Sequence, residues 1–260
     1  MKKRYAKSIL VQLAMTAFFL SSVASAQDAP PLAELWIVVP KAGHEQQLKE
    51  GLAKHMAFRS EQGDPWQWDV YTPLLGDDLN RVVTRSCCHN WTDVDAYADW
   101  VRGHPAVNAH FSEHVSPHTE KSEHYFEEMD WANSHWNPEA SSYSYFAVTE
   151  FTLKAGSEAD FHAAREKMSQ IAINQGWADD TRSWIWVTTI GGPPQVAVIV
   201  PYANFAGMGR AANGFSDFLA QQLGSAEAAA QLMDQFSEAT WDSDYQVWVH
   251  EKSLSMPAGD

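Results

Sequence analysis

The chain has 260 residues and carries 18 Lys and Arg against 33 Asp and Glu, which gives a net charge of −15. Four of the basic residues and none of the acidic ones lie in the first 26 residues, so the 234 residues that follow have a charge of −19. A surface this acidic excludes nucleic acid and anionic membrane as expected partners. The twelve tryptophans indicate aromatic cores or apolar pockets.

Residues 1–26 are typical of an export signal. A basic start, Lys2 to Lys7, is followed by an apolar stretch and by the small residues Ala24-Ser25-Ala26. The apolar stretch is too short to span a bilayer comfortably. We therefore expect cleavage after Ala26 and a bacterial protein that is periplasmic or secreted, with no membrane association after cleavage.

The rest of the chain contains one pattern twice. Lys41-Ala42-Gly43 returns 113 residues later as Lys154-Ala155-Gly156, and each copy follows an apolar run and precedes a helical one. A Trp-x-Trp step and an Asn-aromatic step follow in both. The sequence therefore predicts one fold unit used twice, over 33–131 and 143–254, with the site in the first copy and a scaffold in the second.

The predicted elements follow the same order in both copies. In 45–59, Leu48, Leu52 and Met56 repeat at helical spacing, and Phe161 and Met168 do the same in 158–174. The first copy is predicted to have strands 35–39, 66–72, 82–89 and 125–129, with helices 45–59, 92–103 and a short one from Pro105. The second copy is predicted to have strands 145–153, 183–189, 196–201 and 245–252, with a helix 158–174 and a helical region over 215–239.

The predicted order is strand-helix-strand-strand-helix-strand, twice, which is the ferredoxin-like pattern of an α+β protein. Each sheet leaves one apolar face that must be covered. The chain resembles the dimeric α/β-barrel superfamily, which includes antibiotic-biosynthesis monooxygenase-like and haem-degrading monooxygenase-like proteins. The resemblance implies two tandem ferredoxin-like βαββαβ units that pack sheet to sheet as an intramolecular dimeric α/β barrel. We expect a monomeric pseudo-dimer or a homo-oligomer.

Nine of the eleven histidines lie between His44 and His135. The segment from Trp91 to Trp100, followed by His104 and His110, is similar to a helical segment of the haem-degrading proteins. The resemblance implies that His110 ligates haem iron and that Trp100 lies against the porphyrin. The family's asparagine on the first strand is replaced here, in Glu34-Leu35-Trp36. This favours plain haem binding, or another apolar ligand beside Trp36, over oxidative cleavage. Alternatively, Trp100 packs its helix on the sheet and His110 is a surface residue.

A second hypothesis is a zinc or copper site at His110, His114 and His118. A spacing of four places two imidazoles on one helix face. Pro117 is predicted to end the helix before His118. The alternative is a solvated helix face.

A third hypothesis follows from the same resemblance, because related barrels hold aromatic substrates without a cofactor. His89, Asn90, Trp91 and Tyr97 are the candidate ligand-binding residues. Trp91 is also predicted to belong to the core, since its counterpart in the second copy is Phe205. His55 lies beside the apolar stripe of its helix, where it is either a buried core histidine or a base.

The only cysteines, Cys87 and Cys88, are adjacent. Neighbouring Cα atoms lie about 3.8 Å apart across a trans peptide, below the usual disulfide range. We expect two small buried side chains and no ordinary intrachain disulfide; the alternative is a vicinal redox pair or a pair of metal thiolates. Taken together, the sequence predicts an exported protein that binds a small apolar or aromatic molecule and, if it is an enzyme, is a monooxygenase-like oxidoreductase. The alternatives are a non-catalytic binding or interaction protein and a metal-binding protein that uses the histidine cluster.

Overall fold

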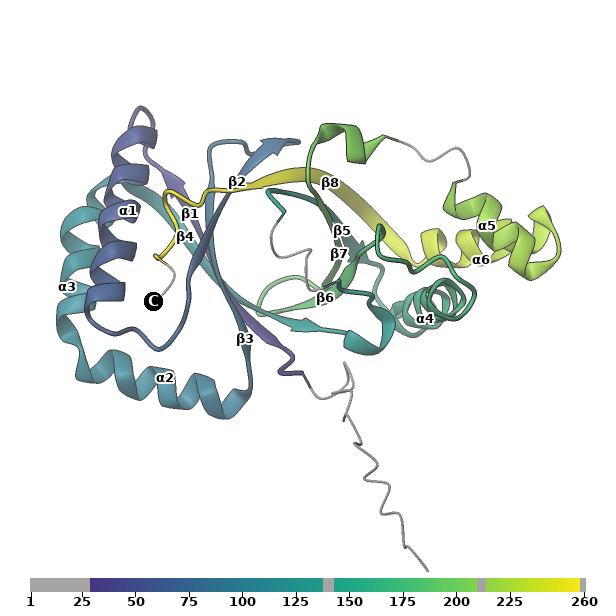
Figure 1. Ribbon diagram of the computed structural model, residues 1–260, viewed down its shortest axis with the longest axis horizontal. Helices are drawn as coiled ribbons and strands as arrows, with labels where there is room; N and C mark the ends of the chain where they lie inside the picture. Colours follow the sequence, from purple (N-terminus) through teal and green to yellow (C-terminus); the bar gives the residue numbers. More distant parts are fainter. Residues whose placement is uncertain (1–28, 138–142, 210–213, 258–260) are drawn as a thin grey trace, which may run out of the picture.

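The computed structural model describes residues 29–137, 143–209 and 214–257. The strands in these residues are β1 Leu32–Pro40, β2 Asp69–Leu75, β3 Val82–His89, β4 Thr119–Met129, β5 Tyr145–Leu153, β6 Ile185–Ile190, β7 Gln195–Tyr202 and β8 Thr240–His250. They close into one antiparallel barrel in the order β1-β3-β2-β8-β5-β7-β6-β4 (Figure 1).

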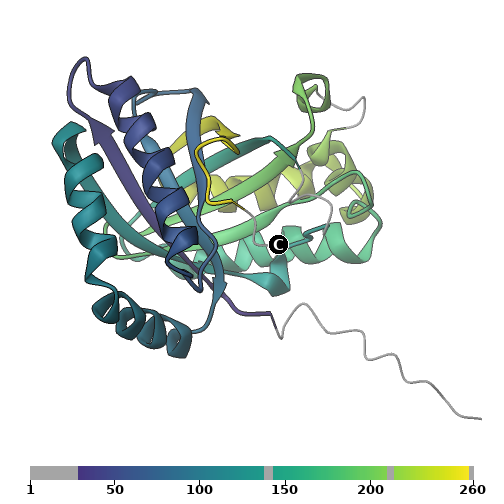
Figure 2. The same cartoon turned by 60° about the vertical axis from the view of Figure 1, so that its left-hand side comes forward.

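The helices lie outside the barrel in two groups (Figures 1 and 2). One group is α1 Glu45–Glu61, α2 Trp91–Gly103 and α3 Pro105–His114; the other is α4 Glu158–Asn174, α5 Phe215–Leu223 and α6 Ala226–Glu238. Short single-turn helices are η2 Ser116–His118, η3 Trp131–Asn133 and η5 Phe205–Met208. None of the helices in the described part of the chain has the length and apolar character needed to cross a bilayer.

The two halves of the chain have the same strand order. The first half runs β4-β1-β3-β2, and the second runs β8-β5-β7-β6. The pairs β2–β8 and β4–β6 join the halves into a ring. Buried positions also repeat: Leu48 and Leu52 on α1 correspond to Phe161 and Arg165 on α4, 113 residues on. Because every described barrel strand is paired on both sides, the barrel has no free sheet edge.

The apolar core has layers inside and outside the barrel. Leu35 on β1 packs with Val148 and Ile199 of the other half, so this face of β1 points inward. The opposite, outward face of β1 carries Val38, which packs against Leu48 on α1. This alternation follows from the two-residue period of a strand. Each fully buried apolar side chain of this size stabilises the fold by about 1.5–3 kcal/mol.

Most predicted elements are confirmed, including the strand 145–153 and the helix 158–174. Several predicted bounds were wrong. Trp66 and Trp68 precede β2 and are buried in the core outside the barrel. Strand β4 begins at Thr119, earlier than predicted. Strand β8 begins at Thr240, also earlier than predicted. The predicted helical region 215–239 is confirmed and consists of two helices, because Gly224 at φ 85° adopts the left-handed conformation that ends α5.

The prediction for the cysteines was also wrong. A disulfide joins Cys87 to Cys88 across a cis peptide bond, with their Cα atoms 3.0 Å apart. The expectation assumed the longer Cα separation of a trans peptide. Cys87 packs with the core inside the barrel, whereas Cys88 is exposed. The predicted signal segment, 1–26, lies outside the described residues.

Candidate functional site

A cavity of about 770 Å³ lies in the second half, between α4, the outer faces of β6 and β7, and the start of α5. Its wall combines aromatic rings and aliphatic side chains with several polar residues. The aromatic rings belong to Trp177, Trp184, Trp186 and Phe215, and the polar lining includes Ser169, Thr181, Arg182, Ser183, Tyr202 and Asp217.

Hydrogen bonds fix the orientation of two of these tryptophans. Trp186 donates its indole N–H to Ser169 Oγ at 3.1 Å, and Trp184 donates to the Asn133 carbonyl at 2.9 Å. Both indoles are buried, so each N–H needs an acceptor within the protein. The ring faces of the cavity wall are therefore held in place before any ligand arrives.

The polar residues of the cavity are anchored too. The Arg182 guanidinium lies 4.4 Å from the Trp177 ring centre, and it donates to the Trp177 carbonyl at 3.2 Å and to Asp179 Oδ2 at 2.5 Å. Burial raises the pKa of the Tyr202 hydroxyl, with a further contribution from Tyr245. Tyr202 is therefore a neutral hydrogen-bonding group at neutral pH.

The corresponding space in the first half is filled by side chains. Trp66 stacks on His89, with ring centres 3.6 Å apart, and on Tyr97 at 3.9 Å. The Tyr97 hydroxyl accepts from Arg59 and from Trp68 Nε1 (3.1 Å). His89 and Tyr97, predicted to bind ligand, are therefore core residues, and burial lowers the pKa of His89.

Small side chains on α4 explain the difference between the halves. Ala172 lines the cavity 113 residues after Arg59, whose side chain occupies the matching space in the first half. Ser169 likewise takes the position of Met56. The half expected to be a scaffold thus holds an aromatic-lined cavity.

His55 and His110 form a contact between α1 and α3. His55 is only 3% exposed, and burial, followed by the charge of Arg59, lowers its pKa to about 3. Arg59 Nη1 lies 3.4 Å from His55 Nε2 and can only donate, so Nε2 is the acceptor and Nδ1 carries the proton. His55 Nδ1 then donates to His110 Nδ1 at 3.4 Å, which leaves the His110 proton on Nε2.

The structure gives Trp100 and His110 different partners. Trp100 stacks on His104 at 4.3 Å and packs on the core beside α1. His110 stacks on Phe58 at 4.3 Å, and burial and then His114 lower its pKa. Asn90 caps α2 through a reciprocal capping box with Asp93.

The three histidines of the predicted metal site are separated into two contacts. His114 lies beside His110, with ring centres 4.3 Å apart. His118 contacts His44, Nδ1 to Nδ1, at 3.0 Å. In the described residues no group of three or more His, Cys, Asp or Glu side chains is placed to hold a metal ion.

Trp36 and Trp91 lie on the outer surface of the first half. Trp91 is 52% exposed, so its predicted place in the core was wrong, and Phe205 is exposed as well. Trp36 is 38% exposed and stacks on His124 at 4.0 Å with the ring planes 6° apart. Both tryptophans are therefore available to a ligand.

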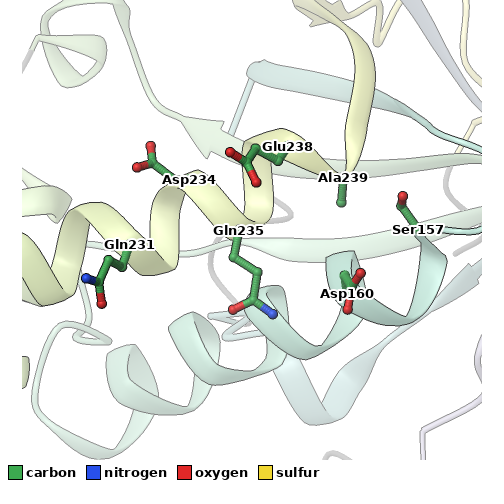
Figure 3. Close-up of a pocket in the computed structure, with 7 residues that line it drawn as sticks. All are labelled: Ser157, Asp160, Gln231, Asp234, Gln235, Glu238 and Ala239. Atoms are coloured by element: carbon green, nitrogen blue, oxygen red, sulfur yellow. The ribbon is translucent and has the colours of Figure 1, made fainter.

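A second hollow, of about 490 Å³, lies between the start of α4 and the end of α6 (Figure 3). Its lining is polar and acidic, with Asp160 on α4 and Asp234 and Glu238 on α6. These carboxylates are presented by two different helices. The aromatic cavity and this acidic hollow thus differ in the chemistry of their walls.

Neither a protein-family model nor a curated protein matches this sequence. Among solved structures, a candidate monooxygenase from Lactobacillus acidophilus NCFM superposes with a TM-score of 0.52 at 11% identity, covering 85% of this chain and 94% of that one. A candidate monooxygenase from Fusobacterium nucleatum gives 0.51 at 9% identity, covering 89% and 100%. The chain is similar to both in fold: it has the dimeric α/β-barrel fold.

Proposed function

We propose that this protein binds a flat aromatic or apolar small molecule in the tryptophan-lined cavity of its second half. The observation that carries the proposal is a volume of about 770 Å³ bounded by three tryptophans and Phe215. Small-molecule sites are commonly about 300–1,000 Å³, mostly apolar, with a few fixed polar groups. The repeated strand order supports describing the scaffold as two tandem ferredoxin-like units in one barrel.

The wall favours a planar ligand. Aromatic rings attract one another in offset or edge-on arrangements worth about 0.5–1.5 kcal/mol beyond the buried area. Because Ser169 and the Asn133 carbonyl already hold Trp186 and Trp184, little ordering is left for binding to impose. Arg182 and Tyr202 supply a cation and a neutral hydroxyl that select for polar substituents.

Haem, which the family resemblance implies at His110, does not fit the contacts of that residue. Among its described lining residues the tryptophan-lined cavity has no histidine or cysteine, although Met168, Met208 and Tyr202 are of residue types that can ligate haem iron. His110 would need a free lone pair on Nε2, but its contact with His55 places the proton there. We derive no step through haem, and we expect added haemin to leave the Soret band unshifted. A stoichiometric shift that His110→Ala removes would contradict this.

The binding proposal is tested with anilinonaphthalene sulfonate, an aromatic probe whose fluorescence rises in apolar sites. We expect saturable binding of one molecule per chain. Ala172→Leu and Val200→Phe place bulk in the cavity from α4 and from β7, and each should weaken binding at least tenfold. The matched control is Ala57→Leu at an exposed position of α1. Equal binding by a folded cavity variant and the wild type would refute the proposal.

A second candidate function is oxygenation of the bound molecule. Its support is the likeness to two candidate monooxygenases. Oxygen uptake during incubation with a naphthol, compared between the wild type and Ala172→Leu, tests it. Uptake that is equal in both, or equal to that of buffer, would reject oxygenation at this cavity.

We also propose export and a monomeric pseudo-dimer. Export is supported by the basic, apolar and small-residue segments of 1–26. Mass spectrometry of the periplasmic protein should find Gln27 as the first residue. Light scattering should give the mass of a single chain, because the ring of strands already closes within one molecule.

A further inference from the structure

The outer face of β1 and β4 carries four side chains that the cavity does not involve. Glu34 and Trp36 are two residues apart on β1, and His124 and Phe126 are two apart on β4, so each pair shares a face. In the register of the two strands, Trp36 is opposite His124 and Glu34 is opposite Phe126. This pairing gathers the four side chains into one patch.

A buried carboxylate orients the imidazole of that patch. Glu34 is only 8% exposed, and its Oε1 accepts from His124 Nε2 at 2.8 Å and from Trp36 Nε1 at 3.0 Å. Because an ionised carboxylate only accepts, the proton of neutral His124 lies on Nε2 and the lone pair on Nδ1. The two contacts on Oε1 also hold Glu34 and the indole in place.

Aromatic rings surround this imidazole on the surface. His124 stacks on Trp36, and its ring centre is 5.4 Å from that of Phe126, which in turn lies 5.4 Å from Trp91. The two tryptophans expose large parts of their rings. A planar ligand can therefore lie on these rings beside His124.

We propose that Glu34 and His124 form a general-base site for a flat aromatic molecule that bears an acidic proton, such as a phenol. His124 Nδ1 accepts the proton; the O–H bond of the ligand breaks, and its electron pair remains on oxygen. Glu34 then faces the imidazolium across the Nε2–H bond and stabilises its charge. His124 is the catalytic residue, Glu34 the positioning residue, and Trp36 part of the binding surface.

The site is tested with nitrobenzisoxazole, a flat aromatic probe opened by a single base. The base removes the proton on carbon, the C–H electron pair forms the nitrile, and the N–O bond breaks to give a coloured phenolate. No further reactant is needed. We expect the protein to open the probe faster than the same concentration of free imidazole.

Three variants separate the roles. His124→Gln should lower kcat/KM about a hundredfold, within the range for a positioned general base. Glu34→Gln should lower kcat about tenfold with little change in KM, and nitrogen NMR of labelled histidine should show that His124 loses its single Nε2–H tautomer. Trp36→Ala should chiefly raise KM. Circular dichroism checks that each variant is folded.

The matched control is His250→Gln. His250 also faces a carboxylate, with Nε2 3.2 Å from Asp69 Oδ1, but it is largely buried and stacks against Tyr71. Its loss should leave the rate unchanged. A wild-type rate no faster than imidazole, or a rate retained by folded His124→Gln, would overturn the proposal. Ala172→Leu should react like the wild type, so failure of the cavity and failure of this site are distinguishable.

Discussion

Replacing His55 by methionine should make the protein resist acid. His55 is buried between α1 and α3, and its pKa is about 3 against an ordinary value of 6.5. Burial is the main cause, followed by the charge of Arg59. Methionine occupies the corresponding position on α4, at Met168, so this backbone position accepts it in the same fold.

The sign follows from which state binds the proton. Below pH 6.5 the unfolded chain protonates His55, whereas the folded chain does not until about pH 3. The contribution to stability is therefore complete at pH 7 and is lost as the pH falls from 6.5 to 3. At 1.36 kcal/mol for each pH unit, the loss is about 5 kcal/mol by pH 3 and about 2 kcal/mol at pH 5.

Urea unfolding at pH 7 and pH 5 measures this effect. Between these two values, the free energy of unfolding of wild type relative to His55→Met should fall by about 2 kcal/mol. Leu52→Met is the control, because it changes a buried side chain on the same helix without removing a titratable group. It should follow the wild type at both pH values. Parallel pH profiles for His55→Met and wild type would refute the assignment.

Substitutions at three further positions test two packing contacts and one helix cap by their effect on the free energy of unfolding in denaturant. Gly51→Ala should cost about 1–3 kcal/mol, since a Cβ there would collide with the His114 carbonyl where α1 meets α3; an unchanged midpoint would contradict that close approach. Phe161→Ala should cost about 3–5 kcal/mol, because the ring is fully buried; a loss below 1 kcal/mol would show that the site is not close-packed. Ser225→Ala should lower the free energy of unfolding by about 1 kcal/mol, because it removes the side-chain acceptor of the Ala228 N–H. Ser225→Asn should keep most of that stability, because asparagine also caps helices.

The fold was largely predictable because its signals are local. The helical spacing of Leu48, Leu52 and Met56 marks α1, and the repeated Lys-Ala-Gly step shows that the pattern returns. The early start of β4 was missed because residues 119–124 are mostly polar. They form a strand through backbone pairing with β1, which a side-chain pattern does not reveal.

The candidate sites were less predictable because they depend on distant residues. Trp36 was identified from the sequence, but its partnership with His124 needs the register of β1 on β4. The cavity was missed for another reason: it results from small side chains, Ala172 and Ser169, and nothing in a sequence marks a space that is left open. The stacking of His89 and Tyr97 on Trp66 likewise depends on the folded chain and is not visible in the sequence.

The first half is filled by side chains beneath α1, whereas the second half has a cavity beneath α4. This difference has a consequence for how such a barrel evolves. In a barrel made from two identical chains every substitution occurs in both halves, so one half cannot lose its cavity while the other retains it. Joining the halves on one polypeptide removes that constraint. Arg59 and Ala172 occupy corresponding positions on α1 and α4. The Arg59 side chain fills the space in the first half, whereas the small Ala172 side chain leaves the cavity in the second half open. The two halves of this chain can therefore take on different functions, which two identical chains in a symmetric dimer cannot do.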